Sequence, residues 1–183
     1  ISVNAVASPL DFDLYHAHAA LAYAPKGTYP NQHTTLCDEK LFPVCSPEFA
    51  QQHGLKPPLT HQALQAITDL PLLGDESPTA RSYGDTWAYW AEQMGVKLPA
   101  EPISRQSQSN ITLQLAELGH GIAIGRTSLV MDALQRKQLI ALTDGQVVNP
   151  CNYYLSINPT LPASRALQTF AHWLISSSRC IET

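Results

Sequence analysis

The segment that most constrains the fold is residues 110–126, NITLQLAELGHGIAIGR, because its periodicity changes from helical to extended around two glycines. Its first half carries apolar residues at helical spacing: Ile111, Leu113, Leu115 and Leu118. Gly119 follows the last of them, where a glycine commonly takes the left-handed conformation that ends a helix. The apolar run 122–124 is typical of a strand buried in a parallel sheet. The segment therefore predicts a helix, a glycine turn and a core strand, which together are half of a βαβ unit.

The entrance to this predicted helix is polar. Residues 105–110, RQSQSN, follow an extended run, and Ser109 or Asn110 is a suitable N-cap. A strand, a polar loop and a helix N-terminus in this order direct backbone N–H groups and the helix dipole toward a negatively charged ligand. The simpler alternative is that Ser109 only caps the helix and that Ser107 is a solvated loop residue. A second polar loop, 74–78, follows the predicted strand 70–73, at the end of a strand where open α/β sheets bind ligands.

Other helices and strands have recognisable signals. Ser46 precedes Pro47 and is expected to cap a helix, and Ser128 is expected to cap the helix 129–136. Trp87 and Trp90 belong to an apolar stripe on the predicted helix 87–94, which favours core packing. The run 41–45 is extended, and the proline inside it favours an edge or linking strand.

Composition excludes several classes of protein. The chain has 183 residues, 44% of them hydrophobic, which is enough for one large or two small globular domains. Eleven Lys and Arg face fifteen Asp and Glu, and the net charge of −4 comes without any basic cluster. A DNA-contacting surface needs a basic patch, so we do not expect this chain itself to contact nucleic acid. It has no apolar run of about 18 or more residues, and we expect no membrane-spanning segment.

The cysteine and histidine spacing argues against a metal site. Cys37, Cys45, Cys151 and Cys180 form no CxxC pair, so we expect reduced thiols and a cytoplasmic location. His16 and His18 would share one face of a strand, but no third ligand lies nearby in the sequence. We therefore expect no metal ion and no cofactor.

Several motifs occur together in one order along the chain: residues 41–47, Trp87 with Trp90, the run 113–126 with its glycine-rich ending, 128–130, 153–155 and the closing FxxWL at 170–174. In this order and spacing the chain resembles the effector-binding domain of LysR-type transcriptional regulators. It is most similar to the branch that holds the glycine-cleavage activator, the β-lactamase regulator and the D-serine deaminase activator. Each motif is weak alone, and the combination covers nearly the whole chain.

The resemblance implies a periplasmic-binding-protein type II-like α/β fold, with two α/β lobes joined by two crossing strands, 41–45 and 151–157. Lobe I would comprise residues 1–45 and 151–183, and lobe II residues 46–150. It also implies a small-molecule effector in the cleft between the lobes. The ligand-binding residues it implies are Ser107, Ser109 and Asn110 before the central helix, Ser46 after the first crossing, and Tyr153 or Tyr154 on the returning strand.

The sequence departs from the family pattern in three places. The N-terminal winged helix-turn-helix is absent, so DNA would be bound only through a segment outside this chain. The first strand and helix of lobe I are absent too, and we expect the chain to be a fragment of a longer protein that forms a homo-oligomer. The usual DLAIR pattern is replaced by Ala19, Ala20, Leu21, Ala22 and Tyr23.

Three alternatives follow from other features. A secreted solute-binding protein would share the two-lobed architecture. An enzyme would need a nucleophile with its base or paired carboxylates, and no motif supplies them, so we expect no catalysis. Cys45 and Cys151 lie on the two expected crossing strands, which raises the hypothesis of a redox-sensitive disulfide.

The Ser, Gln and Asn side chains of the loop 105–110 suit a polar or zwitterionic effector, such as an amino acid or a cell-wall fragment.

Overall fold

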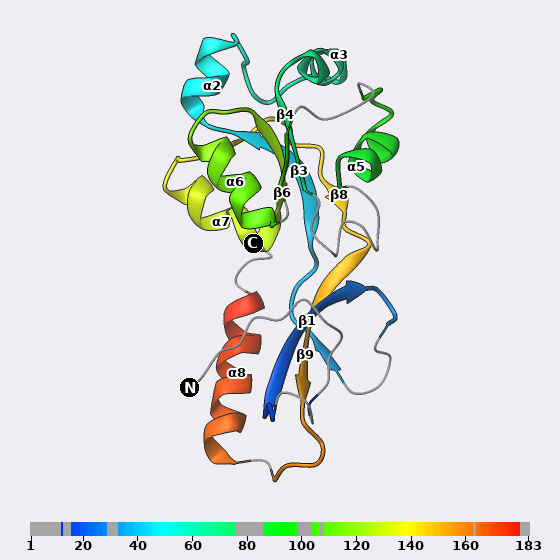
Figure 1. The fold of residues 1–183 in the computed structure, drawn as a ribbon, viewed down its shortest axis with the longest axis vertical. Coiled ribbons are helices and arrows are strands. Elements are labelled where there is room, and N and C mark those ends of the chain that lie inside the picture. The colour runs from blue at the N-terminus through cyan, green and yellow to red at the C-terminus, as the bar shows by residue number, and fades with distance from the viewer. Residues whose placement is uncertain are drawn as a thin grey trace. The chain divides into compact units, whose positions relative to one another are not determined.

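The computed structural model describes residues 12, 16–28, 33–75, 86–98, 104–106, 108–162 and 164–179. The chain forms two compact units, Ile1–Asp38 with Pro150–Thr183 as unit 1 and Glu39–Asn149 as unit 2. The chain therefore passes between the units twice, after Asp38 and after Asn149 (Figure 1). The first passage precedes the strand 40–45, which belongs to unit 2.

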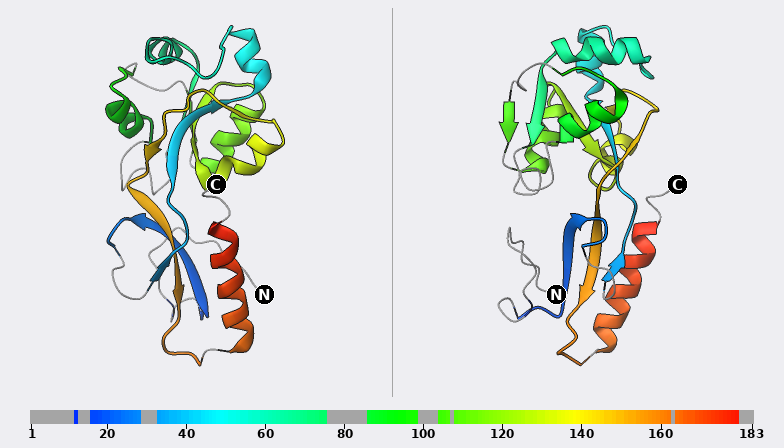
Figure 2. Two further views of the ribbon diagram at one scale, coloured as in Figure 1. Left: turned by 180° about the vertical axis from the view of Figure 1, so that it is seen from behind. Right: turned by 90° about the vertical axis from the view of Figure 1, so that its right-hand side faces the viewer.

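Unit 1 contains an antiparallel sheet in the order β1-β9-β2, built from β1 (Ala19–Pro25), β2 (His33–Thr35) and β9 (Cys151–Ile157). The helix α8 (Arg165–Arg179) lies alongside this sheet (Figure 2). The hydroxyl of Ser178 in α8 donates a hydrogen bond of 2.8 Å to the backbone oxygen of Leu36, just beyond β2. The strand expected at 151–157 is thus present.

Unit 2 is organised by a six-stranded mixed sheet in the order β5-β4-β6-β3-β7, with β8 also paired to β3. Its strands are β3 (Lys40–Cys45), β4 (Leu72–Asp75), β5 (Ser104–Gln106), β6 (Ile122–Arg126), β7 (Ile140–Ala141) and β8 (Val147–Val148). The strand β4 is parallel to both β5 and β6, whereas β3 is antiparallel to β6. The prediction that residues 122–124 form a strand of a parallel sheet is therefore right for the pairing of β6 with β4 and wrong for its pairing with β3.

Helices cover both faces of this sheet. The helices α6 (Ser109–Glu117) and α7 (Thr127–Gln135) lie on one face, and α5 (Thr86–Met94) lies on the other (Figures 1 and 2). Two short helices, α2 (Pro47–Gln52) and α3 (His61–Ala66), and the 3₁₀ turn η1 (Ile67–Asp69) also belong to the unit. No helix in the described ranges is both long and apolar enough to cross a membrane.

The two cores of unit 2 follow from strand alternation, since successive side chains of a strand point to opposite faces. On β3, Leu41 and Cys45 join one buried cluster, while Phe42 and Val44 join the other. The α5 residues Trp87 and Trp90 belong to the first cluster, and α6 and α7 close the second. The two tryptophan rings meet edge to face with centroids 5.7 Å apart, which confirms their expected core role.

The turn between α6 and β6 forms for the reason that the sequence suggests. Gly119 takes a left-handed conformation with φ of +78° directly after Leu118, the C-cap of α6. Gly121 serves a different purpose, because a Cβ atom there would lie 2.5 Å from the backbone oxygen of Pro71. This close approach brings β6 alongside β4.

Candidate functional site

The candidate site lies where the parallel strands of unit 2 end. Asp75 is the last residue of β4, Gln106 ends β5 opposite it, and Arg126 ends β6. Because β4, β5 and β6 are parallel, their carboxyl ends share one edge of the sheet, and α6 begins at this edge with Ser109. This is the edge at which open α/β sheets place ligands.

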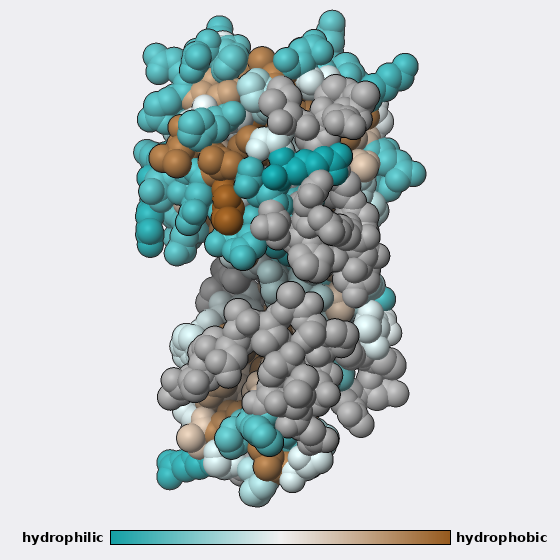
Figure 3. Space-filling view, viewed as in Figure 1, coloured by the Kyte–Doolittle hydropathy of each residue, from teal (hydrophilic) through white to brown (hydrophobic). Residues whose placement is uncertain are grey.

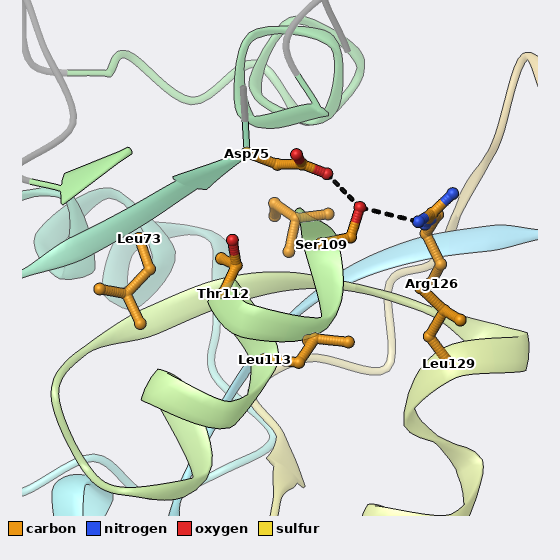
Figure 4. A pocket seen from close by; sticks show the side chains of 8 residues that line it. Leu73, Asp75, Ser109, Thr112, Leu113, Arg126 and Leu129 are labelled. Carbon is orange, nitrogen blue, oxygen red and sulfur yellow. Dashed lines mark hydrogen bonds between the residues drawn. The ribbon is translucent and has the colours of Figure 1, made fainter. Parts of the chain in front are cut away.

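Three side chains from different elements meet at this edge. The hydroxyl of Ser109 donates a hydrogen bond to a carboxylate oxygen of Asp75. The same oxygen, Ser109 Oγ, accepts a 2.9 Å hydrogen bond from Nη2 of Arg126 (Figure 4). A carboxylate, a hydroxyl and a guanidinium are therefore held in sequence, with the serine in the middle. We call this group the Asp75–Ser109–Arg126 cluster.

The position of Ser109 corrects the expected helix cap. The N-cap of α6 is Gln108, whose backbone is extended (φ −138°, ψ 130°) and whose side chain makes no capping bond. Ser109 is the first helical residue, and its hydroxyl is engaged by Asp75 and Arg126. Asn110 is not the N-cap either. A cap prediction uses only local sequence, whereas here two residues from distant parts of the chain compete for the hydroxyl.

The cluster forms one wall of a small pocket with apolar walls beside it. The lining residues are Leu73, Asp75, Ser109, Thr112, Leu113, Ile124, Arg126 and Leu129 (Figure 4). Thr112 helps to fix α6 on the sheet, because its hydroxyl lies 3.4 Å from the backbone oxygen of Gly74 in β4. The free volume inside is about 10 Å³, which is room for a single water molecule. The side chains themselves therefore fill this pocket.

The chemistry of the cluster favours recognition over metal binding. Among the residues that the structure describes, no group of three or more His, Cys, Asp or Glu side chains could hold a metal ion. Arginine stays protonated in proteins, so Arg126 can donate hydrogen bonds to an anion but cannot act as a base. Asp75 offers the opposite charge on the other side of Ser109. The arrangement can hold a ligand that carries both a positive and a negative group.

The other ligand residues expected in unit 2 are not all brought to this edge. Asn110 is exposed in the first turn of α6, beside Ser109, whereas Ser107 lies outside the described residues. Ser46 is 1% exposed, and its hydroxyl accepts the backbone N–H of Phe49 as the N-cap of α2. Because β3 runs antiparallel to β6, Ser46 lies beyond the start of β6, at the opposite edge of the sheet. The structure thus confirms Ser46 as a cap and places it away from the cluster.

The expected tyrosines belong to unit 1. Tyr153 lies opposite Tyr23 across the β1–β9 pair, and their ring centroids are 5.0 Å apart. Tyr154 is buried, and its hydroxyl donates a 3.5 Å hydrogen bond to the backbone oxygen of Pro25. Both residues are thus packed within the unit 1 sheet, and their contact with a ligand stays a prediction.

Comparison with known protein families decides the class of this chain. The LysR substrate binding domain family matches residues 11–179. The chain belongs to this family. As a LysR substrate-binding domain it is an effector-binding domain of the kind found in LysR-type transcriptional regulators, and the secreted solute-binding alternative is not favoured.

Individual relatives agree with this assignment. The HTH-type transcriptional regulator DsdC of Escherichia coli (strain K12) is 32% identical over 146 residues, which cover 78% of this chain and 44% of that protein. This LysR domain therefore spans less than half the length of that curated relative. Its sequence resemblance to the LysR family is confirmed, including the branch that contains DsdC.

Solved structures agree on the fold. The effector domain of AmpR from Pseudomonas aeruginosa is 19% identical, with a TM-score of 0.70 over 96% of this chain and 79% of that one. The AmpR effector binding domain from Citrobacter freundii is 21% identical, with a TM-score of 0.71 over 95% of this chain and 80% of that one. The periplasmic-binding-protein type II-like α/β fold expected for this LysR domain is thus confirmed.

Sequence reasoning found the edge of the site in this LysR domain but missed two of its three members. The sequence alone indicates Asp75 only as part of a polar loop at a strand end, and Arg126 only as the end of a family motif. Each directly ends a short apolar strand, β4 or β6. A charged residue at the carboxyl end of a predicted parallel strand is the signal that could have identified both.

Proposed function

We propose that this LysR domain is the regulatory part of a transcriptional regulator and that a small zwitterionic effector of the amino-acid class binds at the Asp75–Ser109–Arg126 cluster. The observation that carries the proposal is the pair of opposite charges held on either side of the Ser109 hydroxyl. A guanidinium can bind a carboxylate through two parallel hydrogen bonds, and a carboxylate can accept from an ammonium group. An α-amino acid presents both groups within a few bonds.

The N-terminus of α6 adds to the attraction for the negative end of such a ligand. Its N-cap, Gln108, makes no side-chain capping bond. The first backbone N–H groups of a helix carry partial positive charge and favour anions. Because the pocket has room for only about one water molecule, we propose that the effector contacts the cluster from outside this pocket.

The regulatory role requires parts outside this chain. We propose that a helix-turn-helix elsewhere in the protein binds DNA, which is supported by the name of the relative of which this chain spans 44%. An effector can shift the protein between two conformations only if it binds them with different affinity. A coupling of about 1 to 3 kcal/mol is typical of such regulation. Such a protein would act in the cytoplasm, where its DNA is, and would not be an enzyme.

A surface on unit 2 supports the proposal that the full-length protein is a homo-oligomer. Apolar side chains gather over the outer faces of α6 and α7 (Figure 3). They include Leu118, which is 73% exposed, together with Ile111 and Leu129. Contiguous apolar side chains on a surface commonly mark contact with another protein.

A ligand screen with matched analogues tests the proposed effector class. The 183-residue chain is screened by thermal shift with L- and D-amino acids and muropeptides, and hits are titrated by calorimetry. We expect at least one amino acid to raise the melting temperature, because a ligand that binds only the native state stabilises it. Analogues that lack the amine or the carboxylate should bind about tenfold to a hundredfold more weakly, since each loses a charge-assisted hydrogen bond.

Variants locate the binding event. Ser109→Ala and Arg126→Gln should each weaken binding of the identified amino acid by a similar factor. The matched control is Arg136→Gln, because Arg136 is exposed at the C-cap of α7 and pairs with Asp132 at 3.6 Å. Binding by the control should equal that of the wild type. The proposal is wrong if neither amino acids nor muropeptides bind, or if Ser109→Ala and Arg126→Gln bind as the wild type does.

A further inference from the structure

The first and last residues of unit 2 are hydrogen-bonded to each other. Glu39 begins the unit and is 0% exposed, and its backbone oxygen accepts the backbone N–H of Asn149, the last residue of the unit, at 2.8 Å. The two chain segments that connect unit 2 to the rest of the protein are thus hydrogen-bonded to each other at Glu39. Fully buried glutamate is rare unless its carboxylate has a specific partner.

The side chain of Glu39 has such a partner at the start of α7. Its Oε2 accepts the backbone N–H of Ser128 at 3.2 Å. The N-cap of α7 is Arg126, which makes no side-chain capping bond, so a distant carboxylate satisfies a first-turn N–H that a cap residue usually satisfies. This corrects the expected role of Ser128: it supplies a backbone donor, and its own hydroxyl oxygen is buried without a hydrogen-bond partner in the described part of the chain.

Three consecutive residues connect this contact to the candidate site. Arg126 donates to Ser109 in the cluster, at 2.9 Å. Thr127 is bonded to Lys40, because its hydroxyl accepts the Lys40 backbone N–H at 3.2 Å and lies 3.4 Å from the Lys40 backbone oxygen. Ser128 donates to Glu39. A three-residue segment therefore contacts the site at one end and the connection between the units at the other.

We propose that Glu39 is a positioning residue that couples the Asp75–Ser109–Arg126 cluster to the two chain segments leaving unit 2. The regulatory meaning of this coupling rests on the proposed function, since it matters only if an effector binds at the cluster. A ligand that draws Arg126 away from Ser109 displaces the first turn of α7. The buried Glu39 carboxylate moves with that turn, because no solvent is available to replace the lost N–H bond. The Glu39–Asn149 bond then transmits the change to both connecting segments.

Hydrogen exchange without any ligand tests this coupling in a double-mutant cycle. Amide exchange at Ser128 and Asn149 is measured in the 183-residue wild type, in Ser109→Ala, in Glu39→Met and in the double variant. Ser109→Ala releases Arg126 and should speed exchange at both amides by about fivefold, similar to the loss of a helix cap. Glu39→Met keeps the side-chain volume without an acceptor. In that background, adding Ser109→Ala should change the exchange of Asn149 by less than about twofold, because coupled residues are not additive.

Further variants separate coupling from general destabilisation. Glu39→Gln retains a hydrogen-bond acceptor and should restore the effect of Ser109→Ala at Asn149. The control Glu48→Met removes an exposed acidic residue from the first turn of α2. In that background, Ser109→Ala should still speed amide exchange at Asn149 by about fivefold. The amide of Leu64, bonded to the Thr60 oxygen in α3 at 2.8 Å, should exchange equally in all variants. If Glu39→Met does not fold, Thr127→Val removes the Thr127 hydroxyl contacts to Lys40 and should reduce the effect at Asn149 by about half.

Two results would overturn the proposal. One is exchange at Ser128 and Asn149 that does not respond to Ser109→Ala. The other is an effect of Ser109→Ala on Asn149 that is equally large in the wild type and in Glu39→Met, or in Thr127→Val. Because no ligand is used, these outcomes are independent of the effector screen. If an amino acid binds in the screen but the exchange cycle shows no coupling, only the role of Glu39 is refuted. If the exchange cycle shows coupling but no amino acid binds in the screen, only the proposed effector class is refuted.

Discussion

Nη2 of Arg126 donates a hydrogen bond to Oγ of Ser109 over 2.9 Å, although 17 residues separate them in the chain. The bond joins the end of β6 to the start of α6, the two elements that the turn at Gly119 connects. Ser109 in turn donates to Asp75 at the end of β4. One hydroxyl therefore fixes the relative positions of two strands and a helix at the edge where ligands bind in such sheets.

Removing this hydroxyl should weaken the fold measurably. Ser109→Ala breaks both the bond to Asp75 and the bond from Arg126, and we expect the free energy of unfolding to fall by about 1 to 2 kcal/mol. Urea denaturation monitored by circular dichroism measures the change. Asn110→Ala is the control, because Asn110 is exposed on the next position of the same helix. The control should change stability by less than about 0.5 kcal/mol, and equal losses in the two variants would contradict the structural role of Ser109.

Trp87 should contribute more to stability than an exposed tryptophan. Its indole nitrogen donates a 2.9 Å hydrogen bond to the backbone oxygen of Leu73 in β4, and the residue is 2% exposed. Trp87→Phe removes that donor and part of a core ring, so we expect a loss of about 2 to 3 kcal/mol in the free energy of unfolding. Trp173, which is 59% exposed, is the matched control. Trp173→Phe should have an effect within about 0.5 kcal/mol in the same denaturation experiment.

The turn before β6 could be predicted because its causes are local. The apolar spacing of α6, the left-handed Gly119 and the β-branched run of β6 all lie within residues 110–126, and each was expected from the sequence. The choice of helix caps was wrong at Ser109 and Ser128 because Asp75, Arg126 and Glu39 come from distant parts of the chain. Single-sequence patterns contain no information about such partners.

The position of β3 shows a second limit. Pro43 favoured an edge or linking strand, yet β3 lies inside the sheet with β6 on one side. On its other side, β3 pairs with β8 at Lys40 and Leu41 and with β7 at Val44 and Cys45. Pro43 falls between these two pairings, and its backbone oxygen accepts the N–H of Leu142 at 2.9 Å. A proline is tolerated there because the sheet requires its carbonyl group but no N–H group.

Gly121 should tolerate substitution less well than a glycine in open space. A Cβ atom at Gly121 would lie 2.5 Å from the backbone oxygen of Pro71. That oxygen also accepts the N–H of Ile122 at 2.9 Å, so it cannot move without breaking the start of β6. We expect Gly121→Ala to cost about 3 kcal/mol. Gly54 has no atom within 4 Å of such a Cβ but has a φ of +65°, so Gly54→Ala should cost about 1 kcal/mol. A larger loss in Gly54→Ala than in Gly121→Ala would contradict the close approach.

The thiol of Cys45 should be unreactive in the native protein. Burial raises the pKa of Cys45 from 9.0 to about 12, and a hydrogen bond with the backbone of Ala50 offsets only part of this effect. At pH 8 the reactive thiolate is then about one part in ten thousand. Labelling with a thiol reagent at pH 8 should modify Cys45 only after denaturation. Rapid labelling of Cys45 in the folded protein would show that the burial seen in the structure is wrong.

The same pKa predicts a loss of stability at high pH. Because the pKa of Cys45 is higher in the folded protein than in the unfolded chain, the folded state binds more protons between pH 9 and about 12. The free energy of unfolding should therefore decrease as the pH rises through this range, and Cys45→Ala should make the decrease shallower. Urea denaturation of both proteins at pH 7, 9 and 10 measures the difference. Parallel pH profiles for the two proteins would contradict the prediction.

The hypothesis of a redox disulfide receives no support from these thiols. Cys45 lies in unit 2 and Cys151 in unit 1, and both are buried and reduced in the described part of the chain. Disulfide formation requires a thiolate, which the raised pKa of Cys45 disfavours. Thiol counting before and after peroxide treatment should therefore give the same number for these two cysteines.

The location of the effector is tested most directly by nuclear magnetic resonance on the ¹⁵N-labelled 183-residue chain. The amino acid that gives the largest thermal shift is titrated, and the amide and guanidinium resonances are followed. We predict saturable shifts of the Ser109 and Asn110 amides and of the Arg126 guanidinium, with the same dissociation constant at all three. Saturable shifts confined to the opposite edge of the sheet, around Ser46 and Glu48, would contradict the assignment of the Asp75–Ser109–Arg126 cluster as the effector site.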